Sequence, residues 1–496
     1  MEKRNINDKD SKINNNNNII NIKNILCTFI IICPILDSAS FLFRNIFNTK
    51  ISPSTFIRAL VPIVLILYLF FKKGEKFKKN MVLIGSTYLL YGIIHLIVFK
   101  STITKSSYGN VLHEAQYIMN YTFMIINLIS FLYIFTKEKN DKKGNEKLAK
   151  SLLISNVIYI LLIFIAIITK TSSRTYIEGM GYKGWFESGN SIGSILILSL
   201  FVTIGFIKDK KYRYIAIPTI VLEGIFLTML LGTRVGLLGF ILVIMTYVVV
   251  ELIFSIIHKK KNSKRILVGG IVTIIVILSV IITLGSTTVQ RRKHLHDIEK
   301  NIYDEEKQEE SHITGSLLKI KEKIDNNILE ENFMTEAEKK SVIDLYNICN
   351  KYKIKNNDQR NQQLIYNIAL IKNQKNPIYI LFGNGYVTNF RELILEMEIP
   401  AFLLNFGIYG FILYFVPFLI IWIYGLYNGM KNIKKIDSQY VMLEIGTGFV
   451  FLLSFFAGYT FFNSSNMIII VVLNTMLLNK TYKLKLEENK KGNRGK

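Results

Sequence analysis

Long apolar runs of about 18 to 25 residues recur along the chain from Ile25 to Leu478. They are too long and too numerous for the buried core helices of a water-soluble protein. A hydrocarbon layer of about 30 Å is crossed by helices of this length, because a helix satisfies its own backbone hydrogen bonds in lipid. The pattern therefore predicts an all-α polytopic membrane protein.

Twelve transmembrane helices are predicted, with ends fixed to within several residues. They cover residues 25–46, 55–71, 80–99, 115–135, 149–169, 190–207, 214–231, 235–257, 266–284, 400–427, 439–460 and 463–479.

Lys and Arg gather in alternate connections between these helices. More than half of the 61 basic residues lie in the first 23 residues, 72–79, 136–150, 208–213, 258–265, 431–435 and the tail after Asn479. Basic loops stay in the cytoplasm, so the alternation predicts cytoplasmic termini and an even number of spans. Because the formal charge of +25 is spread over many loops, it does not predict a nucleic-acid interface.

The composition excludes several other classes of protein. Half of the residues are hydrophobic and 20% are charged, which excludes collagen-like and disordered chains. The three cysteines, Cys27, Cys33 and Cys349, are too few and too scattered for a disulfide framework or a Cys-rich zinc site. No small-residue cleavage site follows the first apolar run, so no cleavable signal peptide is predicted.

The predicted domain organisation follows from these patterns. The Asn- and Lys-rich first 24 residues predict a disordered cytoplasmic tail. Nine helices over 25–284, an extracytoplasmic loop domain over 285–398, three helices over 399–479 and a basic cytoplasmic tail over 480–496 complete the chain.

The long loop is predicted to be an ordered cap of short helices. It carries half of the 36 Asp and Glu residues and is near neutral. Apolar residues three and four apart predict a helix over 316–333, and TEAE at 335–338 has the Thr and Glu of a capping box before a second helix. A third helix over 358–374 has one predicted apolar stripe: Leu364, Ile365, Ile368 and Ile371.

The segment LFGNGY at 381–386 follows this third helix. Its two glycines predict a tight turn. No strand–turn–helix frame surrounds them, so they do not predict a phosphate-binding loop.

Arginines near the outer helix ends are the first candidates for chemistry. Arg234 lies between two apolar runs with glycines on both sides, and it is either an interfacial anchor or a guanidinium that grips a phosphate. Arg174, Arg360 and Arg391 are further arginines of this kind, each either a solvated charge or a ligand.

Two carboxylates stand just before Pro400, where the loop enters the membrane. Glu396 and Glu398 point about 200° apart if they lie on a helix, so at most one readily faces a given site. They are either surface charges, or one of them is a general base.

The roles of the remaining polar residues are less clearly indicated by the sequence. Asn190, in WFESGNSIG at 185–193, either caps a helix or binds a sugar hydroxyl. Glu251 and Glu444 are explained by pairing with basic loops, whereas Asp37 and Glu223 lie in or near spans without an evident role.

Metal binding is not predicted. HLHD at 294–297 offers ligands, but nothing elsewhere completes a site at a recognisable spacing. No cofactor is predicted either.

The order of several short motifs resembles the O-antigen ligase and polysaccharide polymerase family of bacterial membrane glycosyltransferases. The motifs are WFESGN with SIG, GTRVGLLGF at 232–240, NDQR at 357–360, LFGNGY, and LEMEIPAFLLNFGIYGFILYF at 395–415. The resemblance covers most of the chain through sparse motifs, and it implies a glycosyltransferase of the GT-C-like kind with its site at the outer face.

The resemblance also implies roles for individual residues. Arg234 matches the arginine that contacts the lipid diphosphate, Arg360 the loop arginine, and Glu396 the acidic residue ahead of the last long span. Glu396, as the base, and Arg234 are the candidates for catalysis, and Arg360, Asn190, Arg391 and Glu398 are the candidates for substrate binding. Ligase members place a histidine in this loop, and no histidine follows His312 here. The chain instead resembles the Gram-positive branch of the family, which tends to have Glu-Met-Asp where this chain has Glu396-Met397-Glu398. Glu398 in place of Asp is a departure from that pattern.

The implied function is polymerisation of undecaprenyl-diphosphate-linked repeat units in capsule or exopolysaccharide biosynthesis, by inverting, metal-independent transfer. Its implied partners are this lipid-linked glycan, the bilayer and other polysaccharide-assembly membrane proteins. Ligase-type transfer of finished glycan to another acceptor remains an alternative. A flippase or another twelve-span transporter is disfavoured, because no repeat relates the two halves of the chain. A non-catalytic scaffold would not need the arginine and carboxylate set.

Overall fold

The structure is a computed structural model of the 496-residue chain. It describes residues 2–47, 53–102, 110–136, 142–176, 179–257, 270, 286–294, 321, 324–326, 334–354, 359–388, 393–456, 458 and 460–492.

The described chain is almost entirely helical. The first helices are α1 (Glu2–Phe47), α2 (Pro53–Lys72), α3 (Glu75–Lys100), α4 (Val111–Thr136) and α5 (Lys142–Ile168). An antiparallel hairpin of β1 (Ser173–Arg174) and β2 (Tyr182–Gly184) follows. Next come α6 (Gly189–Thr203), the 3-10 turn η1 (Ile204–Lys208), α7 (Arg213–Ile225), the π-helical η2 (Phe226–Leu230) and α8 (Arg234–Ile257).

The second part of the chain contains the loop helices and the last spans. The loop helices are α12 (Glu336–Tyr352), α13 (Gln359–Gln374) and α14 (Ile378–Phe382). They are followed by α15 (Glu398–Leu404), α16 (Gly407–Gly410), the π-helical η4 (Phe411–Phe415), α17 (Val416–Lys431), α18 (Ser438–Phe456) and α19 (Ser464–Gly492).

Ten helices in the described part of the chain are long and apolar enough to cross a membrane. They fall on ten of the twelve predicted spans, which confirms a multi-pass all-α membrane protein. The predicted span 55–71 corresponds to α2, a helix of 20 residues. Of the predicted span 266–284, only Gly270 is described.

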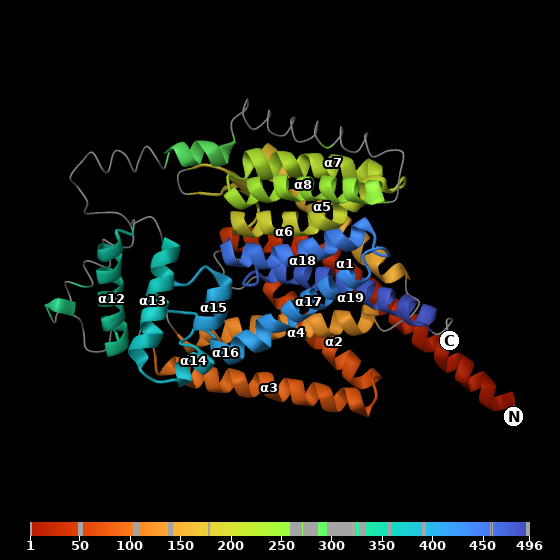
Figure 1. The fold of residues 1–496 in the computed structure, drawn as a ribbon, viewed down its shortest axis with the longest axis horizontal. Coiled ribbons are helices and arrows are strands. Elements are labelled where there is room, and N and C mark those ends of the chain that lie inside the picture. Colours follow the sequence, from red (N-terminus) through yellow and green to blue (C-terminus); the bar gives the residue numbers. More distant parts are fainter. Residues whose placement is uncertain are drawn as a thin grey trace.

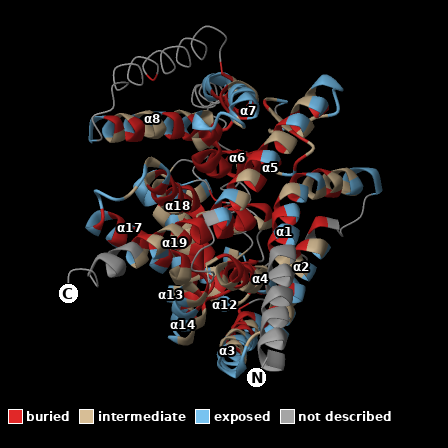
Figure 2. Ribbon diagram, turned by 90° about the vertical axis from the view of Figure 1, so that its right-hand side faces the viewer, coloured by how far each residue is buried: buried red, intermediate tan, exposed pale blue. Residues whose placement is uncertain are grey.

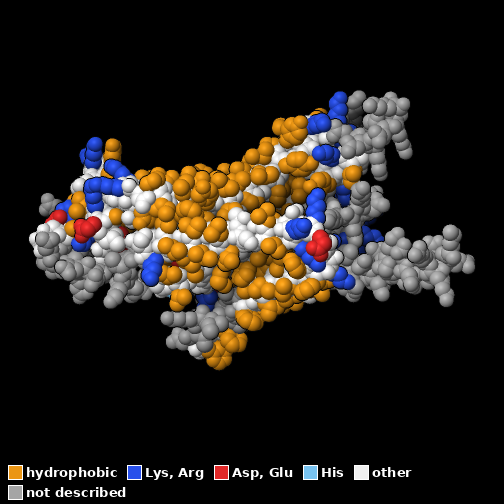
Figure 3. All heavy atoms as spheres, turned by 90° about the horizontal axis from the view of Figure 1, so that it is seen from below, with side chains coloured by type: hydrophobic (Ala, Val, Ile, Leu, Met, Phe, Trp, Pro, Cys, Tyr) orange, Lys and Arg blue, Asp and Glu red, His pale blue; other side chains and the backbone are white. Residues whose placement is uncertain are grey.

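The helices of the bundle run side by side, with α12 and α13 at one end and both chain termini at the other (Figure 1). We call the end that carries α12 and α13 the loop side. Apolar side chains cover the face between the two ends, and Lys and Arg gather near the ends (Figure 3). A lipid-facing band between two polar surfaces has this pattern.

Helices α6 and α19 lie inside the bundle. Nearly every residue of α6 is buried (Figure 2), and α19 packs against α4, α17, α18 and α6. Both helices start on the loop side, so their first residues are held by packing on several sides.

The predicted span 400–427 is not one continuous helix. α15 ends at Leu404 and α16 begins at Gly407, where φ is +71°. The reason is an insertion from the loop: Gly385 N donates to Asn405 O at 2.9 Å, and Asn384 N donates to Leu404 O at 3.3 Å. The break places the LFGNGY segment against the membrane entry of α15 and α16.

The loop helices form a small core of their own. α12 begins with the predicted capping box, since Thr335 Oγ1 accepts from Glu338 N at 3.2 Å and Glu338 Oε2 accepts from Thr335 N at 2.9 Å. The core residues are Met334, Val342, Leu345, Cys349, Tyr366, Leu370 and Leu393. The predicted helix 316–333 lies largely outside the described residues.

The apolar stripe predicted for α13 is packed only in part, with Leu364 and Ile365 lying against the hydrophobic cores. Ile368 is 50% exposed, whereas Gln363, Tyr366 and Asn367 are buried. The buried face carries polar groups because Gln363 accepts from Glu396 N and Asn367 donates to Leu393 O near the end of the loop. Burial on this helix therefore serves hydrogen bonding as well as apolar contact.

The first 24 residues also differ from the prediction. α1 begins at Glu2, so residues 2–24 continue the first transmembrane helix. This segment contains no Pro or Gly, so nothing in it interrupts a helix that the apolar run has nucleated.

Candidate functional site

An ion pair joins the loop helix α13 to the segment that enters the membrane. Arg360 Nε lies 3.3 Å from Glu396 Oε2, and Arg360 NH1 donates to Phe456 O. The side chains of Arg360 and Glu396 are 38% and 29% exposed, so both remain accessible. The structure thus brings together two residues that stand 36 positions apart in the sequence.

The backbone around Glu396 is held by α13. Glu396 N donates to Gln363 Oε1 at 3.1 Å, and Asn367 Nδ2 donates to Leu393 O at 3.2 Å. These two contacts stand one helical turn apart on α13, so they fix both the position and the direction of the segment. Glu396 is therefore presented on a rigid support.

Glu398 points to a different place. Its carboxyl is fully buried and accepts from the backbone N–H groups of Thr460, Phe461 and Phe462 at 2.6, 2.9 and 2.8 Å. Burial raises the pKa of Glu398 to about 8, and the three backbone donors act in the opposite direction. Glu398 ties the turn before α19 to the start of α15. Its assignment to substrate binding stays a prediction.

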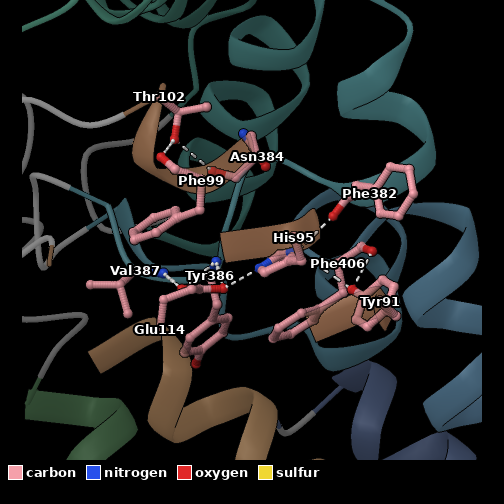
Figure 4. Close-up of polar contacts among 10 residues, drawn as sticks. All are labelled: Tyr91, His95, Phe99, Thr102, Glu114, Phe382, Asn384, Tyr386, Val387 and Phe406. Atoms are coloured by element: carbon pink, nitrogen blue, oxygen red, sulfur yellow. Dashed lines mark hydrogen bonds and ion pairs between the residues drawn. The ribbon is translucent and has the colours of Figure 1, made fainter. Parts of the chain in front are cut away.

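The LFGNGY turn is bound to α3 and α4 by a buried polar cluster (Figure 4). Glu114 accepts from Tyr386 N at 3.0 Å and from Val387 N at 2.9 Å. His95 Nε2 lies 2.7 Å from Glu114 Oε1, and His95 Nδ1 lies 2.6 Å from Phe382 O. A carbonyl oxygen can only accept, so Nδ1 carries a hydrogen.

Glycine is required at two positions of this turn. A Cβ on Gly383 would lie 2.0 Å from Asn405 O, and a Cβ on Gly385 would lie 2.0 Å from the ring of Phe99. Their φ angles are +81° and +91°, a region that side-chain-bearing residues rarely adopt. The prediction of a tight turn is confirmed, and the turn acts as a clamp between the loop and the membrane helices.

Arg234 begins α8 on the loop side and is exposed. Among the described residues it has no hydrogen bond or ion pair. Thr233 caps the helix, because Gly236 N donates to Thr233 Oγ1 at 3.1 Å. A Cβ on Gly236 would lie 2.9 Å from Leu227 O, so this glycine allows the close turn before the helix.

Two aromatic–arginine contacts lie beside this turn. The Arg174 guanidinium lies 4.1 Å from the ring centre of Tyr182, and that of Arg291 lies 3.4 Å from the ring centre of Tyr176. Thr175 Oγ1 donates to Leu231 O at 2.8 Å, which attaches the hairpin to the start of α8. The loop side therefore carries several guanidinium groups around the start of α8.

Asn190 does not cap α6. Ser188 is the N-cap, with its side chain accepting from Ser191 N at 3.4 Å. Asn190 is half-buried and has no hydrogen bond to another described residue, so capping does not explain it.

The acidic residues of the spans are arranged in different ways. Asp37 Oδ1 lies 2.6 Å from Arg58 NH2, and Glu251 pairs with Lys208 as predicted. The predicted pairing of Glu444 is wrong within the described residues, because the structure places no partner at its carboxylate. Glu223 is likewise buried without a described partner.

Two candidates lie outside the described residues. These are Arg391 and all of HLHD except His294. In the described ranges, no three His, Cys, Asp or Glu side chains gather as metal ligands.

The geometry adds residues that the sequence did not indicate. His95, Glu114 and Gln363 determine where the LFGNGY turn and Glu396 lie, yet none belongs to a quoted motif. The available signal was the presence of a histidine and a glutamate in apolar helices, where polar groups are costly.

A family model described as O-antigen ligase like membrane protein matches residues 20–483. The chain belongs to this family. The comparison with curated proteins found no match. The match to this family spans nearly the whole chain, including the helix bundle, the loop helices and all the contacts described above. The resemblance inferred from the short motifs is therefore confirmed.

Proposed function

We propose that this member of the O-antigen ligase-like family is a glycosyltransferase that polymerises lipid-linked oligosaccharide repeat units. The observation that carries the proposal is the accessible Glu396 carboxylate, which is held by Arg360 and by the backbone contacts to α13. A carboxylate with a fixed position is suited to accept a proton from an attacking hydroxyl group.

Arg234 is suited to the diphosphate of the donor. The N-terminus of a helix is its positive end, where an arginine costs about 0.3–1 kcal/mol unless an anion lies beside it. The exposed Arg234 guanidinium at this helix start is suited to bind an oxyanion.

The proposed reaction is a single displacement with inversion. The acceptor hydroxyl oxygen forms a bond to C1 of the donor sugar, and its proton passes to the Glu396 carboxylate. The bond between C1 and the diphosphate oxygen breaks, and undecaprenyl diphosphate leaves with the electron pair. Arg234 stabilises the negative charge that develops on this leaving group.

Arg360 acts here as a positioning residue. Its guanidinium is shared between Glu396 and Phe456 O, so it orients the carboxylate toward the acceptor. Because the Arg234 guanidinium stabilises the developing charge, the proposal includes transfer without a metal.

The proposal places this reaction at the outer face of the cytoplasmic membrane. The loop side would face outward and both termini would face the cytoplasm, as the basic loops predict. The products would serve a surface polysaccharide such as a capsule or exopolysaccharide. Arg391, Glu398 and Asn190 remain proposed substrate contacts.

The choice of acceptor tests the polymerase assignment. Purified protein in nanodiscs would receive lipid-linked repeat units alone, or together with a second glycan acceptor, with a metal chelator present. A ladder of products from the repeat unit alone is expected. Transfer only to the second acceptor would indicate a ligase, and no transfer to any acceptor would contradict the glycosyltransferase assignment.

A further inference from the structure

The chain reaches Arg234 through a bend between two helices. The π-helical η2 ends at Leu230, and α8 begins at Arg234. Between them, Leu231 and Thr233 are buried and Gly232 has φ +81°. The last carbonyl groups of a helix have no donor within the helix, so their partners come from elsewhere. We call residues 229–234 the Arg234 turn.

The hairpin after α5 supplies one of these partners. Thr175 Oγ1 donates to Leu231 O at 2.8 Å. The Thr175 side chain is closely enclosed, because a Cβ on Gly181 would lie 2.8 Å from its Oγ1 and a Cβ on Gly189 would lie 2.5 Å from its Cγ2. A β-branched side chain is stiff at χ1, so this packing fixes the direction in which the hydroxyl group donates.

The segment that follows the predicted ninth span supplies two more partners. Thr287 Oγ1 donates to Met229 O, and Thr288 Oγ1 donates to Thr233 O at 3.4 Å. The three acceptors are alternate residues of the Arg234 turn, and the last of them directly precedes the arginine. The carbonyl groups that lead up to the arginine are therefore bound by hydroxyl groups from two other segments.

Both segments also approach the turn at Gly232. A Cβ on this glycine would lie 3.5 Å from Tyr176 Cε2 and 3.6 Å from Thr287 Cβ. The ring of Tyr176 is in turn covered by the Arg291 guanidinium, which lies 3.4 Å from the ring centre. The turn is thus enclosed by the hairpin on one side and by the later segment on the other.

We propose that Thr175 and Thr287 are positioning residues for Arg234. Their hydroxyl groups hold the backbone before the arginine, which fixes the direction in which α8 starts and the exposed guanidinium emerges. A group held in its binding direction loses less conformational entropy when it binds a ligand. The role of the diphosphate as that ligand rests on the proposed function, whereas the holding of the turn rests on the contacts themselves.

A nitroxide at position 234 tests the holding of the turn. Arg234→Cys would be labelled with a methanethiosulfonate nitroxide in the full-length protein in nanodiscs. The native cysteines are all buried, so the electron paramagnetic resonance spectrum reports the new thiol. Thr175→Val and Thr287→Val remove a hydroxyl group and keep the branched shape. Each should increase the mobility of the label, and Thr175→Ser should not.

A third threonine provides the matched control. Thr219 Oγ1 also donates to a carbonyl oxygen, Ile215 O, at 2.8 Å, and Thr219 is likewise buried, but it lies in the middle of α7. Thr219→Val should leave the label at position 234 unchanged. An equal increase in mobility in all three valine variants would overturn a specific role for Thr175 and Thr287.

The affinity for undecaprenyl diphosphate without sugar tests the consequence for the arginine. Thr175→Val should weaken binding about three- to tenfold, the value of one neutral hydrogen bond, and Thr175→Ser should restore it. In the Arg234→Ala background, Thr175→Val should cause no further loss, because the threonine acts through the arginine. Equal losses in both backgrounds would show a general structural effect and would overturn the positioning role.

The two measurements separate this inference from the proposed function. If the valine variants free the label while undecaprenyl diphosphate binds equally to wild type and Arg234→Ala, the held turn stands and the diphosphate assignment fails. A label whose mobility neither Thr175→Val nor Thr287→Val changes would overturn the inference, even in a protein that transfers glycan. If Thr175→Val does not fold, Thr287→Val decides both measurements.

Discussion

Arg360 Nε lies 3.3 Å from Glu396 Oε2, and this contact joins the loop helices to the entry of the membrane segment. A surface pair of this exposure contributes at most about 1 kcal/mol to stability, so its main consequence is position. Gln363 accepts a hydrogen bond from Glu396 N, so both the backbone and the carboxylate of Glu396 are fixed in position.

The pair predicts non-additive kinetic effects. Glu396→Gln should lower kcat about 10²- to 10⁴-fold, as expected for loss of a general base. Arg360→Ala should cost about tenfold alone and nothing more in the double variant, because it acts through Glu396. A double-mutant cycle on the rate of transfer checks this. Arg213→Ala, an arginine stacked on Tyr214 at the opposite end of the bundle, is the control. Losses that multiply for Arg360 and Glu396 would show independent roles.

The buried Glu114 cluster predicts a large loss of stability on mutation. Glu114→Gln leaves His95 and the N–H groups of Tyr386 and Val387 incompletely paired, which should cost about 3 to 5 kcal/mol. The thermal midpoint of the purified protein in detergent measures this. Glu336→Gln is the control, because its 89% exposed side chain pairs with Lys339 at the surface and its loss should leave the midpoint unchanged. Equal midpoints for the two variants would contradict the clamp.

Glycine substitutions test the close approach of the LFGNGY turn. Gly385→Ala should destabilise the protein by about 2 to 4 kcal/mol, since the new Cβ meets Phe99 at a positive φ. Gly85→Ala on α3, which has nothing within 4 Å, should be neutral or stabilising by up to about 1 kcal/mol. The same thermal measurement distinguishes them. A stable Gly385→Ala protein would show that the turn has room for a side chain.

Glu398 predicts a pH dependence of stability. Its folded pKa of about 8 exceeds the ordinary value of 4.5, so between these values the folded state retains a proton that the unfolded state has released. Its contribution is therefore full below about pH 4.5 and falls as the pH rises to about 8. Midpoints of the wild type should fall over this range relative to those of Glu398→Gln. Parallel curves for the two proteins would contradict the assignment.

Local patterns in the sequence predicted much of the fold. The apolar runs predicted ten spans that the structure bears out, and TEAE predicted the capping box of α12. These signals are local, because helix length and capping depend on residues within a few positions. The two glycines of LFGNGY likewise predicted a turn without any knowledge of the segment that packs against it.

Contacts between distant segments were beyond prediction from the sequence. Glu114 binds backbone groups 272 and 273 positions away, and nothing near Glu114 specifies that partner. The polar buried face of α13 and the break at Asn405 have the same origin, since both arise where another segment packs. Of the two explanations for Asn190, capping is excluded because Ser188, two positions earlier, supplies the cap.

The most direct test of the central claim is the product ladder formed from lipid-linked repeat units by three proteins. The wild type should form a ladder. Glu396→Gln and Arg234→Ala should each reduce it at least about 100-fold while keeping the wild-type thermal midpoint. A ladder of wild-type length and yield in either folded variant would contradict the account of the site.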